Sequence, residues 1–247
     1  MSEYKILYES HDELGPLIVL DSKTTRTLSF GDNDEQSKLL KLQPHIPQHT
    51  YVQAMLLVLL FLNPKRVLIL GLGGGGLIHA LKHFDAGIKM TAVELRQPVI
   101  DIAKRYFQLP VGKKLAIEHS DAAIFLASGQ HKKVDVIFAD IYSAQGVDQN
   151  QLSDPFIADA AAMLKAEGVL VLNCWKEHSQ DRELRARLKQ HFAQVSGCLT
   201  GAGNWVIFAT KRDQQMTHSG LKSKAQQLSQ QLDFPLEKLL TRFDVWD

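Results

Sequence analysis

Residues 67–94 read VLILGLGGGGLIHALKHFDAGIKMTAVE, and the order of their parts decides the expected fold. The aliphatic run Val67–Leu70 has the composition of a strand that is buried on both faces. Six residues follow, five of them glycine, and their missing Cβ atoms allow positive φ and close approach of the backbone to a ligand. Residues 77–84 predict a helix, Lys89–Val93 predicts a second strand, and Glu94 stands at its carboxyl end.

The distance between the glycines and the carboxylate supports a nucleotide site. Glu94 follows the last glycine, Gly76, by 18 residues, close to the roughly 20 of nucleotide-binding βαβ units. At the end of a strand in a doubly wound sheet, such a carboxylate can accept hydrogen bonds from both ribose hydroxyls. We therefore expect an adenosine-type ligand, with a tight structural turn as the alternative interpretation of the glycines.

Composition narrows the class of protein. The 247 residues carry 28 basic and 27 acidic side chains, a net charge of +1 that does not favour nucleic acid as a partner. Cys174 and Cys198 lack metal-ligand spacing, which fits a reducing cytoplasm. The first residues, Met1–Lys5, form no apolar signal core. The apolar run Met55–Leu62 is far shorter than the roughly 20 residues of a membrane span. We expect a cytoplasmic protein without a membrane partner.

Strands and helices are expected to alternate through most of the chain. Short strands expected at 4–9, 17–20 and 24–30, before the first helix, predict a small N-terminal β domain at residues 1–46. Residues 47–247 then form an α/β domain. The expected strands of that domain lie at 67–70, 89–93, 115–119, 134–139, 168–173, 194–199 and 206–210, and the expected helices at 48–62, 77–84, 97–107, 122–128, 154–165, 181–191, 221–232 and 236–243. The pattern predicts a Rossmann-like, methyltransferase-type sheet of seven strands, closed by an antiparallel hairpin.

Polar residues at the expected strand ends are the candidate site residues, because ligands collect there in sheets of this kind. Asp121 follows the third strand and can accept from an adenine amino group or cap the next helix. Asp140 and Tyr142 follow the fourth strand and are expected to face the centre of the cleft. Asn173 and Trp175, at the end of the fifth, line an acceptor pocket or pack in the core.

Histidine pairs give no metal site in this interpretation. His79 and His83 stand four apart on an expected helix, but no third ligand is apparent, which favours a solvated face. His45 and His49 are separated by Pro47, which breaks the helical geometry that such a pair needs. We expect no metal.

From about Leu14 to Thr210 the sequence resembles the spermidine synthase-like group of S-adenosylmethionine-dependent methyltransferase-fold proteins. The motifs that carry the resemblance are Gly15–Asp21, Asn63–Gly71, Ala92–Leu95, Ser120–Ala122 and Val134–Asp140. The resemblance implies an S-adenosyl sulfonium cofactor, a homodimer formed through the N-terminal strands, and a substrate-covering segment near Gln48, Tyr51 and Gln53. It also implies that the glycines approach the sulfonium ligand, that Glu94 holds the ribose, and that Asp121 and Ala122 read adenine.

Two departures from the family pattern concern the reaction. Polyamine-forming members carry an aspartate within the glycine cluster and a second one three residues after the first acid of strand four. This chain has Gly74 and Ser143 at those places. An attacking amine must lose a proton, so a missing carboxylate makes ordinary spermidine synthesis doubtful. Glycine amides in place of an acid also suit the carboxylate of intact S-adenosylmethionine.

The leading hypothesis is therefore a transferase that moves an alkyl group, most simply methyl, from S-adenosylmethionine to a small acceptor, which can be an amine. An aminopropyltransferase that uses decarboxylated S-adenosylmethionine and a catalytically silent nucleotide-binding or oligomerisation protein are the alternatives. A dinucleotide oxidoreductase fits the glycines as well, but not the closing hairpin. We assign catalysis to Asp140 and Tyr142. The expected cofactor-binding residues are Gly71, Gly73, Gly74, Gly75, Glu94, Asp121, Ala122 and Asp140.

Overall fold

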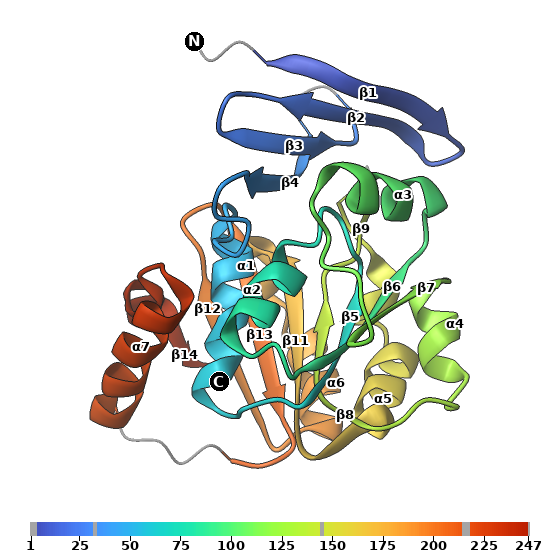
Figure 1. The fold of residues 1–247 in the computed structure, drawn as a ribbon. Coiled ribbons are helices and arrows are strands. Elements are labelled where there is room, and N and C mark those ends of the chain that lie inside the picture. The colour runs from blue at the N-terminus through green and yellow to red at the C-terminus, as the bar shows by residue number, and fades with distance from the viewer. Residues whose placement is uncertain (1–3, 32–33, 144–145, 214–217, 247) are drawn as a thin grey trace.

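The described residues form two main sheets and one short two-stranded hairpin, and the smaller main sheet lies across one end of the larger (Figure 1). The computed structural model describes residues 4–31, 34–143, 146–213 and 218–246. In the part of the chain that it describes, no helix combines the length and the apolar character that a membrane span requires.

The small sheet is antiparallel, with its four strands in the order of the chain. Its strands are β1 (Lys5–Asp12), β2 (Gly15–Asp21), β3 (Thr25–Ser29) and β4 (Glu35–Leu40). One face of this sheet packs against the helix α3 (Gln97–Tyr106) and fully buries Leu17, Val19 and Leu28. The sequence predicted the first three strands but not β4, because the polar run Glu35–Lys38 has little strand propensity.

The large sheet has the order β14-β12-β13-β11-β8-β5-β6-β7. Its strands are β5 (Arg66–Leu70), β6 (Lys89–Glu94), β7 (Leu115–His119), β8 (Val134–Ala139), β11 (Leu164–Trp175), β12 (Gln194–Leu199), β13 (Asn204–Thr210) and β14 (Phe243–Val245). The five strands from β11 to β7 run parallel, and the pairs made by β13, β12 and β14 are antiparallel. The α/β class, the parallel sheet and the closing hairpin are confirmed.

The described part of the large sheet has eight strands, one more than the seven that the sequence predicts. β14 pairs with β12 at the edge, with Ser196 opposite Val245. The expected helix over 236–243 is instead the 3₁₀ turn η4 (Leu236–Arg242), which leads directly into this strand. The expected helix over 48–62 is divided as well, into α1 (Thr50–Met55) and the 3₁₀ segment η1 (Leu56–Leu60). All five residues of η1 are fully buried, so this segment packs against the protein on every side and has no solvent-exposed face.

Helices cover both faces of the large sheet (Figure 1). The remaining helical elements are α2 (Gly76–Phe84), α3 (Gln97–Tyr106), α4 (Ala122–Ala127), η2 (Gln149–Leu152), α5 (Asp154–Met163), η3 (Lys176–Gln180), α6 (Arg182–His191) and α7 (His218–Leu232). One core lies under α1, η1, α2 and α7, and a second lies under α4, α5 and α6. A short hairpin, β9 (Tyr142–Ser143) with β10 (Gly146–Val147), follows β8.

Polar contacts join the small sheet to the α/β part. The guanidinium of Arg96 donates to the Asp12 carboxylate at 2.7 and 3.0 Å and to the Gly15 carbonyl oxygen at 2.9 Å. Arg96 is only 7% exposed, so this ion pair is shielded from water. Arg26 donates to the carbonyl oxygen of Tyr106 at 2.6 Å. The division of the chain into domains at residue 46 stays a prediction.

Candidate active site

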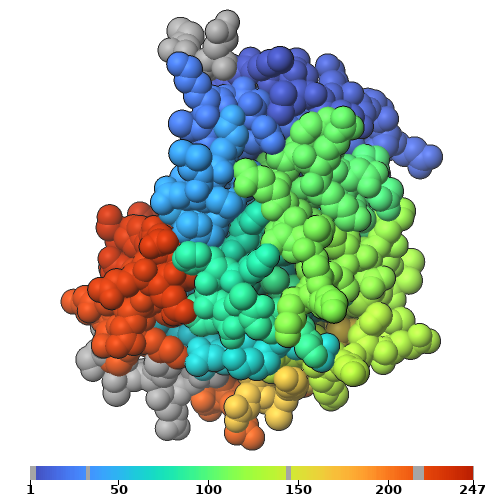
Figure 2. All heavy atoms as spheres, in the orientation of Figure 1, coloured from blue at the N-terminus to red at the C-terminus, as the bar shows by residue number. Residues whose placement is uncertain are grey.

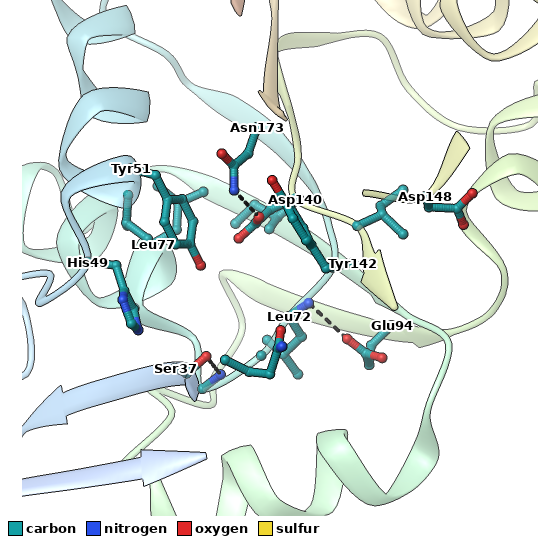
Figure 3. A pocket seen from close by; sticks show the side chains of 18 of the residues that line it. Ser37, His49, Tyr51, Leu72, Leu77, Glu94, Asp140, Tyr142, Asp148 and Asn173 are labelled. Carbon is teal, nitrogen blue, oxygen red and sulfur yellow. Dashed lines mark hydrogen bonds between the residues drawn. The ribbon is translucent and has the colours of Figure 1, made fainter. Parts of the chain in front are cut away.

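A cavity of about 700 Å³ lies where the carboxyl ends of the central strands meet β4 and α1 (Figure 3). This volume is within the range of about 300–1,000 Å³ that small-molecule sites occupy. The structure brings every predicted site residue to this one cavity, namely Gly71, Gly73, Gly74, Gly75, Glu94, Asp121, Ala122, Asp140 and Tyr142. Their individual roles stay predictions.

Three glycines of the loop between β5 and α2 have positive φ: Gly71 at 91°, Gly73 at 50° and Gly75 at 75°. At Gly71 a Cβ atom would collide with the backbone carbonyl of Asp140, so the loop passes directly beside the end of β8. Gly75 is the N-cap of α2, and no side chain caps this helix end. The free amides of the first turn therefore remain available to a ligand.

Gly74 differs from its neighbours, because its φ is negative and its amide is already engaged. The Gly74 N–H donates to the Ser37 hydroxyl of β4 at 2.8 Å. A Cβ atom at this position would lie 2.6 Å from Cδ1 of the buried Phe107. Glycine amides of this loop were expected to suit the carboxylate of intact S-adenosylmethionine. The Gly74 amide has an internal acceptor and is not available for that contact.

Two backbone amides hold Glu94 at the edge of the cavity. Its Oε2 accepts from the Leu72 N–H and its Oε1 from the Arg96 N–H, both at 2.9 Å. Burial raises the pKa of the Glu94 carboxyl, and the two amide donors oppose that rise. The Gly73 amide also lowers this pKa as a third donor. A carboxylate has about four acceptor positions, so the side chain can still accept from a sugar hydroxyl.

Asp121 caps the N-terminus of α4, which was the structural alternative to a contact with adenine. Its Oδ1 accepts from the Ile124 N–H at 2.9 Å and caps α4. The residue also lines the cavity, together with Ala122. Capping uses one carboxylate oxygen, and the structure is therefore compatible with both roles.

Asp140 lies at the centre of the polar cluster shown in Figure 3. Its Oδ1 accepts from Asn173 Nδ2 at 2.8 Å, and the carboxylate also accepts from the Tyr51 hydroxyl. Asn173 is itself oriented, since its Oδ1 accepts from Asn204 Nδ2 at 3.1 Å. Burial raises the pKa of Asp140 from its ordinary 3.8 to about 6, and the donors Asn173 and Tyr51 oppose the rise.

Two tyrosines flank this carboxylate in Figure 3. Burial raises the pKa of Tyr142 and of Tyr51 well above 10, and the adjacent Asp140 raises both further. Both phenols therefore keep their protons and act as donors. The Tyr142 ring lies edge-on to Trp175, with centroids 6.0 Å apart. Its hydroxyl is buried near Asn204 but has no partner at hydrogen-bonding geometry among the described residues.

The lining of the cavity is strongly acidic. Seven carboxylates line it, those of Glu13, Asp34, Glu35, Glu94, Asp121, Asp140 and Asp148. Among the described residues of the lining, the only lysine and arginine are Lys38 and Arg96. Arg96 is paired with Asp12, and Lys38 contacts Glu35 at 3.1 Å. Such a surface attracts cations and repels a free carboxylate.

Sequence reasoning gave too little weight to some residues here. Tyr51 contacts the central carboxylate, and Ser37 of the unpredicted strand β4 reaches the glycine loop. Gln48 lines the cavity, whereas Gln53 donates to the carbonyl oxygen of Pro47 and is not part of the lining. No sequence signal pointed to Ser37.

Two further expectations have definite outcomes. The solvated face predicted for the histidine pair of α2 is wrong for His79, which is 7% exposed with Nε2 2.8 Å from the Phe107 carbonyl oxygen. The side chain of Ser143 lies outside the described residues, so its proposed replacement of an acid is untested.

Comparison with known proteins agrees with this architecture. Residues 43–219 match the model of the spermine/spermidine synthase domain. The polyamine aminopropyltransferase of Neisseria meningitidis (strain Z2491) is 29% identical over 170 residues, which span 68% of this chain and 64% of that protein. The fold is similar to that of Thermotoga maritima spermidine synthase, with a TM-score of 0.72, 17% identity, and coverage of 98% of this chain and 86% of that one.

A spermidine synthase solved with the transition-state analogue AdoDATO gives a TM-score of 0.74 at 18% identity, covering 98% of this chain and 86% of that one. The curated relatives are named for aminopropyl transfer, so the comparisons do not support methyl transfer, the leading hypothesis, and favour its aminopropyl alternative. The chain spans less than two thirds of the length of these relatives. With 177 of its 247 residues inside the family model, the chain belongs to the spermine/spermidine synthase domain family.

Proposed function

We propose that this protein is an aminopropyltransferase that uses decarboxylated S-adenosylmethionine and a cationic amine acceptor. The observation that carries the proposal is the buried Asp140 carboxylate, held by Asn173 and Tyr51 at the end of β8 and facing the cavity. Membership of the family and the names of its curated relatives support the same reaction class.

The glycine loop and its neighbours fit a sulfonium nucleoside. Positive φ at Gly71, Gly73 and Gly75 keeps the loop free of side chains, and the α2 amides face the same space. We assign Glu94 to the ribose hydroxyls, and Asp121 with Ala122 to the adenine edge. When bound, the sulfonium supplies an activated carbon whose bond to sulfur breaks as the acceptor nitrogen attacks.

The acidic lining supports the choice between the two sulfonium forms. The decarboxylated form carries an amine where intact S-adenosylmethionine also carries a carboxylate, and seven acidic side chains favour the form without that carboxylate. The amide of Gly74, engaged by Ser37, offers no compensating donor. Gly74 stands where the family pattern has an aspartate, so the other acidic residues of the lining have to attract the amine of the decarboxylated form.

Asp140 is the residue to which we assign the acceptor proton. A carboxyl whose pKa lies near 6 is ionised at neutral pH, and it is a stronger base than an ordinary carboxylate. It pairs with the cationic amine and takes one proton from it, which frees the nitrogen lone pair. The neutral amine then attacks the activated carbon, and the thioether leaves with the electrons of the carbon–sulfur bond. Tyr51 and Tyr142 stay protonated and border the path of the amine.

Product analysis tests the proposal. The protein is incubated with each sulfonium form and a panel of diamines, and the products are identified by mass. We expect aminopropyl gain and release of the thioether nucleoside with the decarboxylated form alone. Methyl gain with intact S-adenosylmethionine would contradict the proposal. Binding without turnover of either form would favour the silent alternative.

Calorimetry with the two sulfonium forms gives a second, independent readout. We expect the decarboxylated form to bind more tightly, since the cavity lacks a free cation among its described residues to pair with the extra carboxylate. Equal affinity for the two forms would show that the acidic lining does not select between them. It would leave the assignment of Asp140 as the base unchanged. A cytoplasmic location and a homodimer built through the N-terminal strands stay predictions.

A further inference from the structure

Two histidines and an aspartate from distant parts of the chain meet on the surface beside α7. His45 precedes α1, His83 lies in the last turn of α2, and Asp233 directly follows α7. Figure 2 shows the red C-terminal segment against the blue of the segment near residue 45 and the teal of α2. None of the three residues lines the cavity described above.

Both imidazole nitrogens lie close to one carboxylate oxygen. His45 Nε2 lies 3.0 Å and His83 Nε2 3.4 Å from the same oxygen, Oδ2 of Asp233. The two imidazole rings are stacked, with centroids 3.8 Å apart and planes 18° apart, and all three ligand atoms lie within 4.8 Å of one another. One ring has to turn about its Cβ–Cγ bond for the in-plane lone pairs of both nitrogens to meet at one ion. A tetrahedral zinc ion with bonds of about 2.0–2.1 Å separates neighbouring ligand atoms by about 3.3 Å. Both observed separations from the carboxylate oxygen lie close to that value.

The cluster is held in place by its surroundings and remains open to solvent. Asp233 adopts the left-handed conformation with φ of 60°, and Gln231 Nε2 donates to the Phe84 carbonyl oxygen at 3.0 Å. This bond ties the end of α7 to the end of α2 on either side of the cluster. The side chains of His45, His83 and Asp233 are 19%, 36% and 50% exposed, which leaves room for a water ligand.

We propose that His45, His83 and Asp233 form a site for one zinc ion, with water as the fourth ligand. The donor set of two imidazoles and one carboxylate, with one open position, is of the kind that zinc takes in proteins. The site joins the segment before α1, the end of α2 and the end of α7, and the ion would fasten these three parts together. This proposal is independent of the proposed reaction.

Metal titration of the purified full chain tests the site. Zinc affinity is measured by competition with a chromophoric chelator, and cobalt(II) is added separately to observe the visible absorption of a tetrahedral site. We expect one ion per chain, a tetrahedral cobalt spectrum, and a melting temperature that rises with zinc. His83→Asn and Asp233→Asn should each weaken zinc binding at least about tenfold, because each removes a direct ligand.

His191→Asn is the matched control. His191 Nε2 lies 3.2 Å from Asp154 Oδ1, so it forms a similar histidine–aspartate pair without a second histidine described beside it. We expect this variant to bind zinc like the wild type. Binding unaffected by His83→Asn and Asp233→Asn, an octahedral cobalt spectrum, or equal loss in His191→Asn would each overturn the proposal. In those cases the cluster is an ordinary ion pair between aspartate and histidine.

Discussion

Replacing Asp140 by asparagine should stabilise the protein at alkaline pH while it abolishes transfer. The folded state raises the pKa of Asp140 from 3.8 to about 6, because burial disfavours the charged form. The unfolded chain therefore releases this proton at lower pH than the folded chain does. Stability from this group is fully present below about pH 4 and is lost as the pH rises to about 6.

The size of the effect follows from the rise in the pKa of Asp140, from 3.8 to about 6. Each pH unit corresponds to about 1.4 kcal/mol, so ionisation of Asp140 lowers the free energy of unfolding by about 3 kcal/mol at pH 8. Asparagine carries no charge and escapes this loss. Its amide oxygen can still accept from Asn173, and its amide N–H₂ can donate to the Tyr51 oxygen, so both contacts of the carboxylate have a replacement.

Urea unfolding of both proteins between pH 4 and pH 8 measures the difference. We expect Asp140→Asn to gain up to about 3 kcal/mol relative to the wild type as the pH rises through this window. The control is Asp159→Asn on α5, outside the cavity, which should transfer the aminopropyl group at the wild-type rate. A stability difference that stays constant with pH, or an Asp140→Asn variant that transfers the aminopropyl group at the wild-type rate, would refute the reasoning.

Three further changes test other parts of the site. Glu94→Gln should weaken binding of the thioether nucleoside at least about tenfold, by loss of charge-assisted hydrogen bonds, and an affinity within twofold in calorimetry would disprove the ribose assignment. Gly74→Asp should lower the melting temperature, because a Cβ atom there lies 2.6 Å from Phe107, and an unchanged temperature in calorimetric scans would show that this ring moves freely. Asn173→Ala removes a donor that lowers the pKa of Asp140; the acidic limb of the pH–rate profile should move to higher pH, and a shift to lower pH would contradict the assigned base.

The sequence was most informative where chemistry follows directly from chain order. Alternating strands and helices imply a parallel sheet, and a parallel sheet gathers the ends of its strands at one edge. Glu94, Asp121 and Asp140 were therefore placed together by position alone, although they are far apart in the chain. The structure has all three around one cavity.

The missed residues depend on contacts between elements, which no local pattern encodes. Tyr51 reaches Asp140 because the buried segment of α1 and η1 docks beside the end of β8. Ser37 belongs to a polar strand that exists because β3 offers it a hydrogen-bonding edge. His79 has a polar side chain but faces inward, because the carbonyl oxygen of Phe107, directly after α3, accepts a hydrogen bond from its ring. In each case tertiary packing outweighs local composition.

The hydrogen bond from the Gly74 amide to the Ser37 hydroxyl makes the N-terminal sheet part of the lining of the cavity. A chimera that joined this α/β part to the N-terminal strands of a relative would leave a buried amide without its acceptor unless serine stood at the same place. A buried donor left in that condition costs about 1–3 kcal/mol. The loop and the strand that supports it therefore depend on each other, and a graft with its seam at residue 46 would separate two parts of the lining of one cavity.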